Sequence, residues 1–385
     1  MRKKIGIGIL IIAILVVLIF CIKTLIGTVI DKKNAVSEEN IISDTKAVLY
    51  LSSALQDTDF KSYAVFIDKQ NKASYMKLNG LDFGTIAYGN KTLFIEDTNS
   101  IRLLTDHKTK KTKFNNAEYA ATYANYLPKQ KLFYSIHNSG VGQNGNYYSN
   151  IRFGNQKKFS YQKIAKYIVA AGNDKENIFY LSENDNGTSY KMSISTISNN
   201  KWKEKISKKI DEWNNQDMTP ISEFFFKDGK AYCLVTNSQN KNKDALSLFI
   251  IDSKKNDYTI QKVKDLKESD TELSGTYSSS TSSYLKDHHL FYVTNEMNVF
   301  SIDINTNKIE KRLELPNTDT NTRLAQVSFH DNLLYYLYKT HQGDYFLDAY
   351  NLTSSKTIQH KKLENMSTIE KRVDGLYNYD MKILQ

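Results

Sequence analysis

The side chains best suited to metal or redox chemistry are two cysteines and one pair of adjacent histidines. Cys21 and Cys233 stand far apart and neither belongs to a Cys-x-x-Cys motif, which argues against a cysteine-based metal or redox site. Cys233 lies within an apolar run, so we expect a buried structural thiol there rather than a nucleophile. His288 and His289 are neighbours, and neighbouring side chains on a strand point to opposite faces. One metal ion would not readily bind both, and we expect this pair to lie in a turn.

Two short strings partly match the oxygen-ligand pattern of a calcium loop. Asp303, Asn305 and Asn307 alternate along the chain, and Glu314 stands where the closing ligand of such a loop is expected. Lys308, however, takes the place of the glycine that makes the sharp turn, and the residues after it have the pattern of a strand. Residues 183–187 are a weaker match. We therefore predict a hairpin turn, and not a calcium site, at both places.

Linear catalytic motifs are absent from the sequence: it contains no His-Glu-x-x-His, no Gly-x-Ser-x-Gly and no Gly-x-x-x-x-Gly-Lys. His137 precedes a stretch rich in Gly and Asn that ends at Gly145, and we expect it to begin a flexible loop that could line a binding face. Hydrolysis of a glycosidic bond there would need paired carboxylates, and none is near in the sequence. The sequence thus predicts no catalytic residue, no metal ligand and no cofactor.

The elements that would position any site form a repeat. A short apolar and aromatic burst recurs along the chain, usually just after a polar cluster typical of a turn. The seven bursts are Val48–Leu51, Leu93–Ile95, Leu132–Tyr134, Ile178–Tyr180, Ala231–Cys233, Leu290–Tyr292 and Leu334–Tyr336. Several are followed by a second strand that ends in Asp or Asn, whose side chains suit tight turns.

Three or four short antiparallel strands in a unit of roughly 40–50 residues are typical of a propeller blade. Residues 46–385 number 340, which divided among seven bursts leaves about 49 for each blade. We predict an all-β, seven-bladed β-propeller, with six and eight blades as alternatives. The alternating stretch from Gly375 to Leu384 is expected to pair with an early blade and close the ring.

Residues Ser301 to Lys308 (Ser-Ile-Asp-Ile-Asn-Thr-Asn-Lys) resemble the strand–turn–strand unit of bacterial quinoprotein-like (PQQ-like) propellers. The resemblance recurs more weakly at the turns after Asp68, Asp252 and Tyr350. It implies the propeller fold. The glycine usual in that turn is Asn307 here, and the tryptophan that often follows is absent, so the resemblance does not extend to a quinone cofactor.

The first thirty residues predict a membrane anchor. Ile5 to Ile22, a run that includes Ile12 and Leu18, contains no charge and would span ~27 Å as a helix, close to the hydrocarbon thickness of a bilayer. The long side chain of Lys23 can reach the headgroups, so we predict that the helix continues to Ile30 and that the anchor covers residues 5–30.

The flanks of the anchor predict its orientation. Arg2, Lys3 and Lys4 precede the apolar run and place residues 1–4 in the cytoplasm by the positive-inside rule. Residues 31–45 are predicted to be a polar stalk and residues 46–385 an extracytoplasmic domain at the cell membrane. The bulky residues before Cys21 disfavour a cleaved signal peptide or lipoprotein signal, although these and the reversed topology stay open as alternatives.

Two stretches depart from the repeat. Trp202, Ile206, Ile210 and Trp213 follow one another at helical spacing, which predicts an amphipathic helix. Such a helix would pack on the propeller or bind a partner or membrane surface, and a strand with coincidental spacing is the other interpretation. The second stretch, Ser269 to Ser283, is rich in Ser and Thr and is expected to be a long exposed loop.

Composition and charge limit the function. The chain is 40% hydrophobic and 24% charged, as globular domains are. Its net charge is +10, of which the first thirty residues carry +4, and the remaining +6 is too weak to predict nucleic-acid binding. It would modestly favour an anionic membrane or wall polymer.

We predict a membrane-tethered, non-catalytic binding or scaffold module for an envelope protein or polymer. The alternative is an envelope glycan hydrolase or lyase whose acids come from several blades, and carboxylates converging at one mouth of the channel would favour it. A sensor that signals through a membrane partner is a third hypothesis.

Overall fold

The computed structural model describes residues 41–384 with the exception of 56–59, 143–144, 184–188, 214–216, 239–243, 268–269, 271–272, 274–280, 317–322 and 374. None of the helices in these ranges is long and apolar enough to cross a membrane. The predicted anchor, with Ile5, Ile12, Leu18 and Ile22, and the basic residues Arg2, Lys3 and Lys4 lie outside the described residues.

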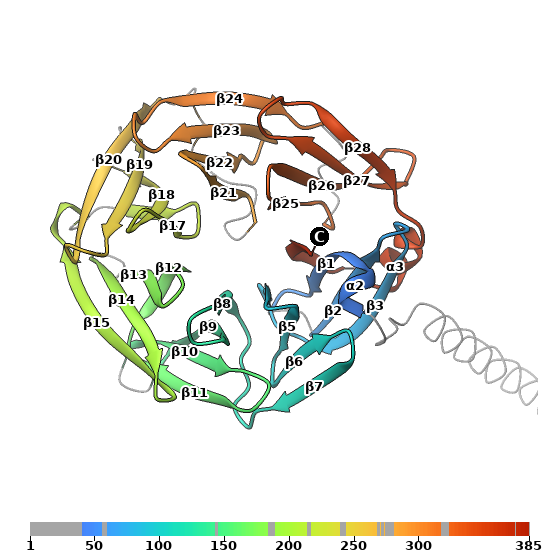
Figure 1. The fold of residues 1–385 in the computed structure, drawn as a ribbon, viewed down its shortest axis with the longest axis horizontal. Coiled ribbons are helices and arrows are strands. Elements are labelled where there is room, and N and C mark those ends of the chain that lie inside the picture. The colour runs from blue at the N-terminus through green and yellow to red at the C-terminus, as the bar shows by residue number, and fades with distance from the viewer. Residues whose placement is uncertain are drawn as a thin grey trace, which may run out of the picture.

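Seven antiparallel sheets stand around a central axis as the blades of a propeller, as predicted (Figure 1). The strands of the first four blades, each from the innermost to the outermost, are β29 (Tyr377–Ile383), β1 (Thr45–Ser52), β2 (Lys61–Asp68) and β3 (Ala73–Asn79) in blade 1; β4 (Ile86–Gly89), β5 (Thr92–Asp97), β6 (Ser100–Thr105) and β7 (Lys108–Lys113) in blade 2; β8 (Ala121–Leu127), β9 (Leu132–Val141), β10 (Tyr147–Gly154) and β11 (Phe159–Ile164) in blade 3; and β12 (Tyr167–Asn173), β13 (Asn177–Glu183), β14 (Tyr190–Ser198) and β15 (Lys201–Ile210) in blade 4.

The other three blades follow the same plan, except that two short strands share the innermost position of blade 5. Their strands are β16 (Asp217–Pro220), β17 (Phe225–Lys227), β18 (Lys230–Ser238), β19 (Asp244–Asp252) and β20 (Asp257–Leu266) in blade 5; β21 (Ser283–Lys286), β22 (His289–Val293), β23 (Asn298–Asp303) and β24 (Ile309–Glu314) in blade 6; and β25 (Gln326–His330), β26 (Leu333–Lys339), β27 (Tyr345–Asn351) and β28 (Thr357–Lys362) in blade 7.

The seven predicted bursts all fall on the second strand of a blade, and burial explains why they are continuously apolar. In β1, Val48 and Tyr50 pack toward blade 2, whereas Leu49 and Leu51 pack toward blade 7. Each sheet is thus covered on both faces, and its middle strands lose the polar alternation of a sheet that faces water on one side. The described core divides into seven apolar clusters, and each lies between two adjacent blades.

The two ends of the described chain close the ring, as predicted. β29 pairs antiparallel with β1, with Ala47 opposite Ile383 and Ser52 opposite Tyr377. The last strand of the chain is therefore the innermost strand of the first blade (Figure 1). This pairing leaves neither end of the blade series exposed as a free edge.

The connections make the two faces of the ring different. On one face, here called the turn face, short turns join the first strand to the second and the third to the outermost. Many of these turns place Asn or Asp at positive φ, as at Asn90, Asp228 and Asn307. On the opposite face, the loop face, the connections are longer, such as residues 267–282 between β20 and β21 and residues 315–325 between β24 and β25.

The described residues include three short helices at the periphery of the ring. α2 (Ile41–Asp44) includes the last described residues of the predicted stalk, and Ile41 and Ile42 are buried between blades 1 and 2. The packed domain therefore begins before the predicted boundary at residue 46. The others are η1 (Asp211–Trp213) and α3 (Met366–Arg372), which precedes β29.

The helix predicted from Trp202 to Trp213 is wrong, because residues 201–210 form the outer strand β15. A spacing of four also keeps residues on one face of a strand, so it does not distinguish the two structures. A register shift between Glu204 and Ile206 then turns the strand over. Trp202 packs toward blade 3, whereas Ile210 packs with Trp213 of η1 toward blade 5.

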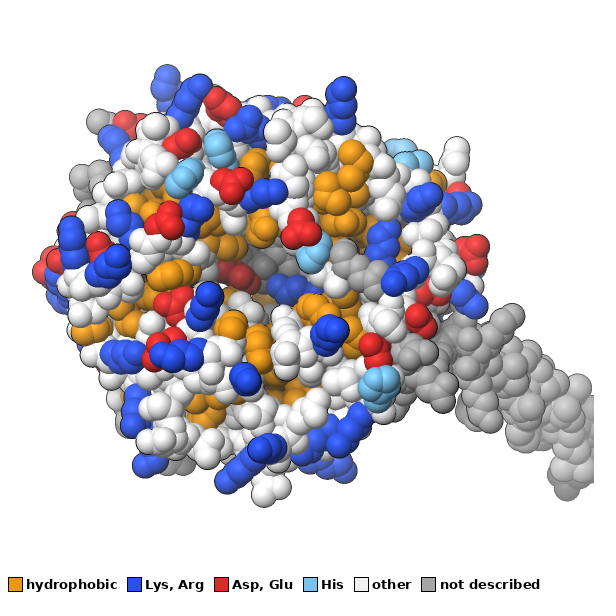
Figure 2. Space-filling view, in the orientation of Figure 1, with side chains coloured by type: hydrophobic (Ala, Val, Ile, Leu, Met, Phe, Trp, Pro, Cys, Tyr) orange, Lys and Arg blue, Asp and Glu red, His pale blue; other side chains and the backbone are white. Residues whose placement is uncertain are grey.

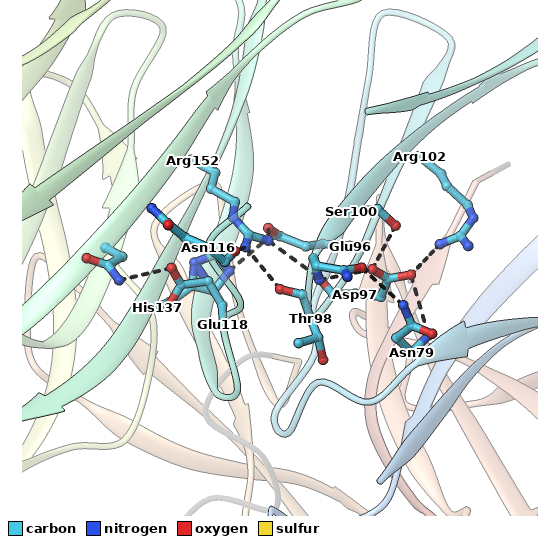
Figure 3. A network of polar contacts seen from close by, with 12 residues as sticks. Asn79, Glu96, Asp97, Thr98, Ser100, Arg102, Asn116, Glu118, His137 and Arg152 are labelled. Atoms are coloured by element: carbon cyan, nitrogen blue, oxygen red, sulfur yellow. Dashed lines mark hydrogen bonds and ion pairs between the residues drawn. The ribbon is translucent and has the colours of Figure 1, made fainter. Parts of the chain in front are cut away.

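A buried ionic network fastens blade 2 to blade 3 (Figure 3). The Arg152 guanidinium of β10 donates to Glu96 Oε1 of β5 at 2.7 Å, and it also donates to the backbone carbonyls of Thr98 and Asn116. The side chain of Arg152 is 0% exposed and that of Glu96 is 2% exposed. Burial raises the pKa of Glu96, and Arg152 opposes that rise. Charge, geometry and backbone acceptors together stabilise a guanidinium that water cannot reach.

We expect Arg152→Met to lower the free energy of unfolding by about 3–5 kcal/mol, because it leaves Glu96 buried without its partner. Chemical unfolding of the purified protein would measure the loss. Lys308→Met, which removes an exposed ion pair with Glu310, is the control and should change stability by less than about 1 kcal/mol. Adding Glu96→Gln to Arg152→Met should restore part of the loss, and a single variant as stable as the parent would contradict this account.

Candidate functional site

The residues singled out from the sequence do not come together in the structure. Cys233 lies in β18, is completely buried and is a free thiol, and burial raises its pKa to about 12. His288 lies in the turn between β21 and β22 and His289 begins β22, where its Nε2 is 3.9 Å from Asp303 Oδ2. Cys233 is therefore the buried structural thiol that the sequence predicts. His288 lies in the predicted turn, whereas His289 is the first residue of the strand that follows it.

His137 differs from its prediction. It does not begin a loop but lies within β9, opposite Ala121 and Asn150, and it is 0% exposed. Burial and the nearby Arg152 guanidinium lower its pKa well below the usual range, so the ring is neutral. The polar stretch after it begins only at the edge of the loop face, and His137 itself belongs to the network of Figure 3.

The first calcium-like string is a hairpin turn, as predicted. Asp303 Oδ1 accepts hydrogen bonds from the backbone N–H groups of Asn305 and Thr306, and Asn307 adopts a positive φ of 58°. The second string lies almost wholly outside the described residues. Within the described ranges, no three His, Cys, Asp or Glu residues are grouped so as to hold a metal ion.

Exposed apolar side chains gather on the loop face of blades 1 to 3. Phe83, Tyr119 and Leu55 are 56%, 52% and 51% exposed, and Tyr377 is 39% exposed. The Phe83 ring lies 4.9 Å from that of Tyr379, which is 6.1 Å from Tyr377. The surface so formed, here called the aromatic patch, consists of Leu55, Phe60, Phe83, Tyr119, Tyr377 and Tyr379.

Asp82 holds the patch together, although it is itself only 7% exposed. Its Oδ1 accepts from the N–H of Phe83 at 3.0 Å and its Oδ2 accepts from the N–H of Leu55 at 3.1 Å. Its own N–H donates to the carbonyl of Tyr119 at 2.8 Å, which ties the loop before β4 to the loop before β8. The buried carboxylate of Asp82 therefore positions Phe83 and Leu55, and its backbone N–H fixes the third exposed residue, Tyr119.

The backbone at Phe83 is strained, since its φ of 51° is unusual for a bulky side chain. The following residue must be glycine, because a Cβ at Gly84 would lie 2.0 Å from the ring of buried Tyr50. The tight approach of Gly84 to Tyr50 turns the chain so that Phe83 projects outward. Strain that presents an exposed aromatic ring is typical of a functional site rather than of packing.

The patch is rimmed by Arg323, whose guanidinium lies 4.9 Å from the centre of the Tyr377 ring. A cation over an aromatic face restrains the ring, and the Tyr377 ring is still 39% exposed. Beside the patch, β29 continues from Tyr379 into the central channel, so the exposed surface and the channel share one strand.

Charged side chains meet inside the channel. Asp380 and Lys382 come from β29 in blade 1, and Glu223 comes from the connection between β16 and β17 in blade 5. Figure 2 shows acidic and basic side chains within the central hollow of the ring. Asp380 is 1% exposed; its Oδ2 accepts from the N–H of Ile86 at 2.7 Å, whereas its Oδ1 has no partner among the described residues.

These three groups shift one another's pKa values. Burial raises the pKa of Glu223 to about 8, with Lys382 lowering it and Asp380 raising it further. Burial also raises the pKa of Asp380, against the effect of Lys382. For Lys382 burial lowers the pKa, but the two carboxyls outweigh burial and the net shift is upward. These shifts favour a protonated Glu223 carboxyl beside the Lys382 ammonium group in the channel.

Sequence reasoning missed both sites, because their members are distant in the chain. Leu55 and Tyr377 belong to opposite ends of the sequence and meet only through ring closure. The one local signal was Asp82-Phe83-Gly84, since an aromatic residue between Asp and Gly in a turn is an unusual place for a large apolar side chain.

The sequence matches a known protein family. The YycP β-propeller domain family matches residues 40–384. The uncharacterized protein YycP of Bacillus subtilis (strain 168) is 22% identical over 357 residues, which cover 90% of this chain and 89% of that protein.

Solved structures are similar at lower identity. A protein from Lactobacillus plantarum is 11% identical with a TM-score of 0.47, and the match covers 83% of this chain and 96% of that one. Apo AztD from Citrobacter koseri is 9% identical with a TM-score of 0.44 and the same coverage of both chains.

The raised pKa of Glu223 predicts a pH-dependent cost to stability. Between the ordinary glutamate pKa of about 4.3 and the folded value of about 8, the folded protein keeps a proton that the unfolded chain has lost. Stability therefore falls as pH rises through this window. We expect Glu223→Gln to remove that fall and to raise the free energy of unfolding at pH 9 by roughly 1–3 kcal/mol, with little change at pH 4.

Thermal or chemical unfolding from pH 4 to pH 9 would measure the difference between Glu223→Gln and the parent. Glu296→Gln, which changes an exposed acid in the loop between β22 and β23, is the matched control and should leave the profile unchanged. Parallel profiles of Glu223→Gln and the parent would show that Glu223 is not held protonated.

Proposed function

The chain belongs to the YycP β-propeller domain family, and we propose that it is a membrane-tethered, extracytoplasmic propeller that acts as a non-catalytic binding or scaffold module for an envelope protein or polymer. The tether is the apolar run from Ile5 to Ile22 with its basic N-terminal flank. The resemblance to quinoprotein-like blades enters the proposal as a likeness of the strand–turn–strand unit, with no quinone cofactor and no nucleic acid partner.

The aromatic patch is the observation that carries the binding role. Monomeric proteins rarely leave several large apolar side chains exposed together unless a partner covers them. Here the side chains come from separate segments of blades 1 to 3, the buried Asp82 carboxylate positions Leu55 and Phe83, and Phe83 is held in a strained conformation. Tyr, Phe and Arg are also the residues that contribute most where proteins bind one another.

A variant pair separates the patch from general surface hydrophobicity. Phe83→Ser with Tyr377→Ser removes two aromatic rings from the patch. Ile358→Ser removes an equally exposed apolar side chain, also 56% exposed, from the outer strand β28. Full-length protein in detergent would be immobilised and exposed to solubilised membrane and wall fractions of the source cell at low and high salt.

We expect the parent and Ile358→Ser to retain the same partner through high salt, and the double patch variant to retain at least about tenfold less, since interface aromatic residues are each worth on the order of 2 kcal/mol. Equal retention by all three proteins would exclude the patch as the binding site. Retention of an anionic polymer that high salt abolishes would assign the partner to the polymer class.

An envelope glycan hydrolase or lyase is the second candidate, and the channel acids favour it. Glu223 and Asp380 come from different blades, and burial raises the pKa of Glu223 to about 8, the direction that a general acid needs. Asp380 has an unpartnered buried oxygen that could orient a hydroxyl or water. The opposing observation is that Asp380 Oδ2 already bonds Ile86, which ties this carboxylate into the ring.

Turnover of a panel of wall glycans by the full-length protein would test this candidate. If the channel is an active site, Glu223→Gln should lower kcat at least about a hundredfold, and the parent rate should fall as pH rises above about 8, where Glu223 loses its proton. Glu296→Gln is again the matched control. No turnover across the panel would remove the enzyme hypothesis.

A further inference from the structure

The described chain enters the propeller at the turn face. The N–H groups of Ile42 and Ser43 in α2 donate to Asp106 Oδ1, in the turn between β6 and β7. The carbonyl of Asp44 accepts from the N–H of Lys69, in the turn between β2 and β3. Figure 1 views the ring from this face, with α2 in front of blade 1. Whatever precedes residue 41 is therefore joined to the ring at its turn face.

The two faces carry opposite charge. The turn-face connections contain twelve lysines and six acidic residues, whereas the described residues of the loop-face connections include five basic and nine acidic residues. All twelve lysines are exposed. Only Lys129 and Lys308 pair with an acid among the described residues. Figure 2 shows the same preponderance of Lys and Arg on the face toward the viewer.

A small cavity opens on the turn face between blades 2 and 3. Its volume is about 180 Å³, and no acidic residue lines it. Lys131 and Lys157 stand at its rim with the amides of Asn90 and Asn155, and Tyr126 and Phe133 form part of its wall. A cationic rim with amide donors above an aromatic wall suits a phosphate group that is attached to a less polar body.

We propose that the turn face docks on an anionic phospholipid surface, with its lysines over the headgroups and one headgroup phosphate in the cavity between blades 2 and 3. This inference rests on the proposed membrane anchor. The docked orientation directs the acidic loop face, and with it the aromatic patch, away from the bilayer toward the partner.

The length of the tether favours a lipid surface over a more distant polymer. The ten residues from 31 to 40 between the predicted anchor and α2 extend at most about 35 Å, so the turn face stays close to the bilayer. Exposed lysines feel an anionic surface only within about one Debye length, ~8–10 Å, and the tether allows that approach. The acidic loop face would be repelled by the same surface.

Lysine reactivity in the intact, anchored protein tests the proposal. Full-length protein would be reconstituted in nanodiscs of phosphatidylcholine alone and of phosphatidylcholine with 30% phosphatidylglycerol, and lysines would be labelled with an amine reagent and quantified by mass spectrometry. The probes are Lys69, Lys157, Lys158 and Lys254 of the turn face. The matched controls are exposed lysines of outer strands: Lys77, Lys111, Lys203 and Lys361.

We expect labelling of the four turn-face lysines to fall at least threefold in the phosphatidylglycerol nanodiscs at 50 mM salt and to recover at 500 mM, with the controls unchanged. A variant with these four lysines changed to Gln should lose the protection of Lys131 and Lys255. The variant with the four control lysines changed to Gln has the same net charge and should keep that protection.

Two outcomes would overturn the proposal: equal labelling of the turn-face lysines in both kinds of nanodisc, or protection by a soluble polyanion such as polyphosphate without protection by phosphatidylglycerol. The last would assign the face to a wall polymer. Failure of the full-length protein to enter nanodiscs would instead contradict the anchor, and with it the tethering in the proposed function.

Discussion

The pairing of β29 with β1 is the constraint on which the rest of the structure depends. Every blade buries its apolar faces only against two neighbours, and blades 1 and 7 have both neighbours only because the last strand completes the first sheet. Leu49 and Leu51 of β1 then pack with Leu337 and Leu347 of blade 7. All seven apolar clusters between blades depend on this one closure. The closure explains how the ring is stable without a disulfide bond among the described residues.

The same strand, β29, contributes residues to both candidate sites. Tyr377 and Tyr379 contribute to the aromatic patch, and Asp380 and Lys382 contribute to the channel charges. A register shift in the pairing with β1 leaves Tyr379 as an extra residue between Asn378 and Asp380, next to the channel charges. Binding at either place would therefore act directly on the element that closes the ring.

The fold could be predicted because its signal is local and repeated: bursts such as Leu334–Tyr336 and turns such as Asp303–Lys308 each report their own blade. The strand β15 was mistaken for a helix because Trp202, Ile206 and Ile210 satisfy both periods, and a register shift cannot be seen in residue spacing. The two sites could not be predicted, because the topology of the whole ring assembles them from distant segments. It brings Leu55 and Tyr377 to one patch, and it brings Glu223 and Asp380 to the channel. The glycines after His137 are seen in the sequence and suggest a loop. The proximity of Arg152 and Glu96, which identifies His137 as part of a buried network, is seen only in the structure.

Ring closure by the final strand has a consequence for biosynthesis. A ribosome makes β1 early and β29 last, so the inner edge of blade 1 stays unpaired while the other six blades emerge. Until β29 pairs, blade 1 exposes both an open strand edge and an uncovered apolar face, and a chain that lacks β29 would expose them permanently. Pairing of β29 with β1 is thus a late step of folding, because strands from both ends of the described chain must meet before blade 1 is complete.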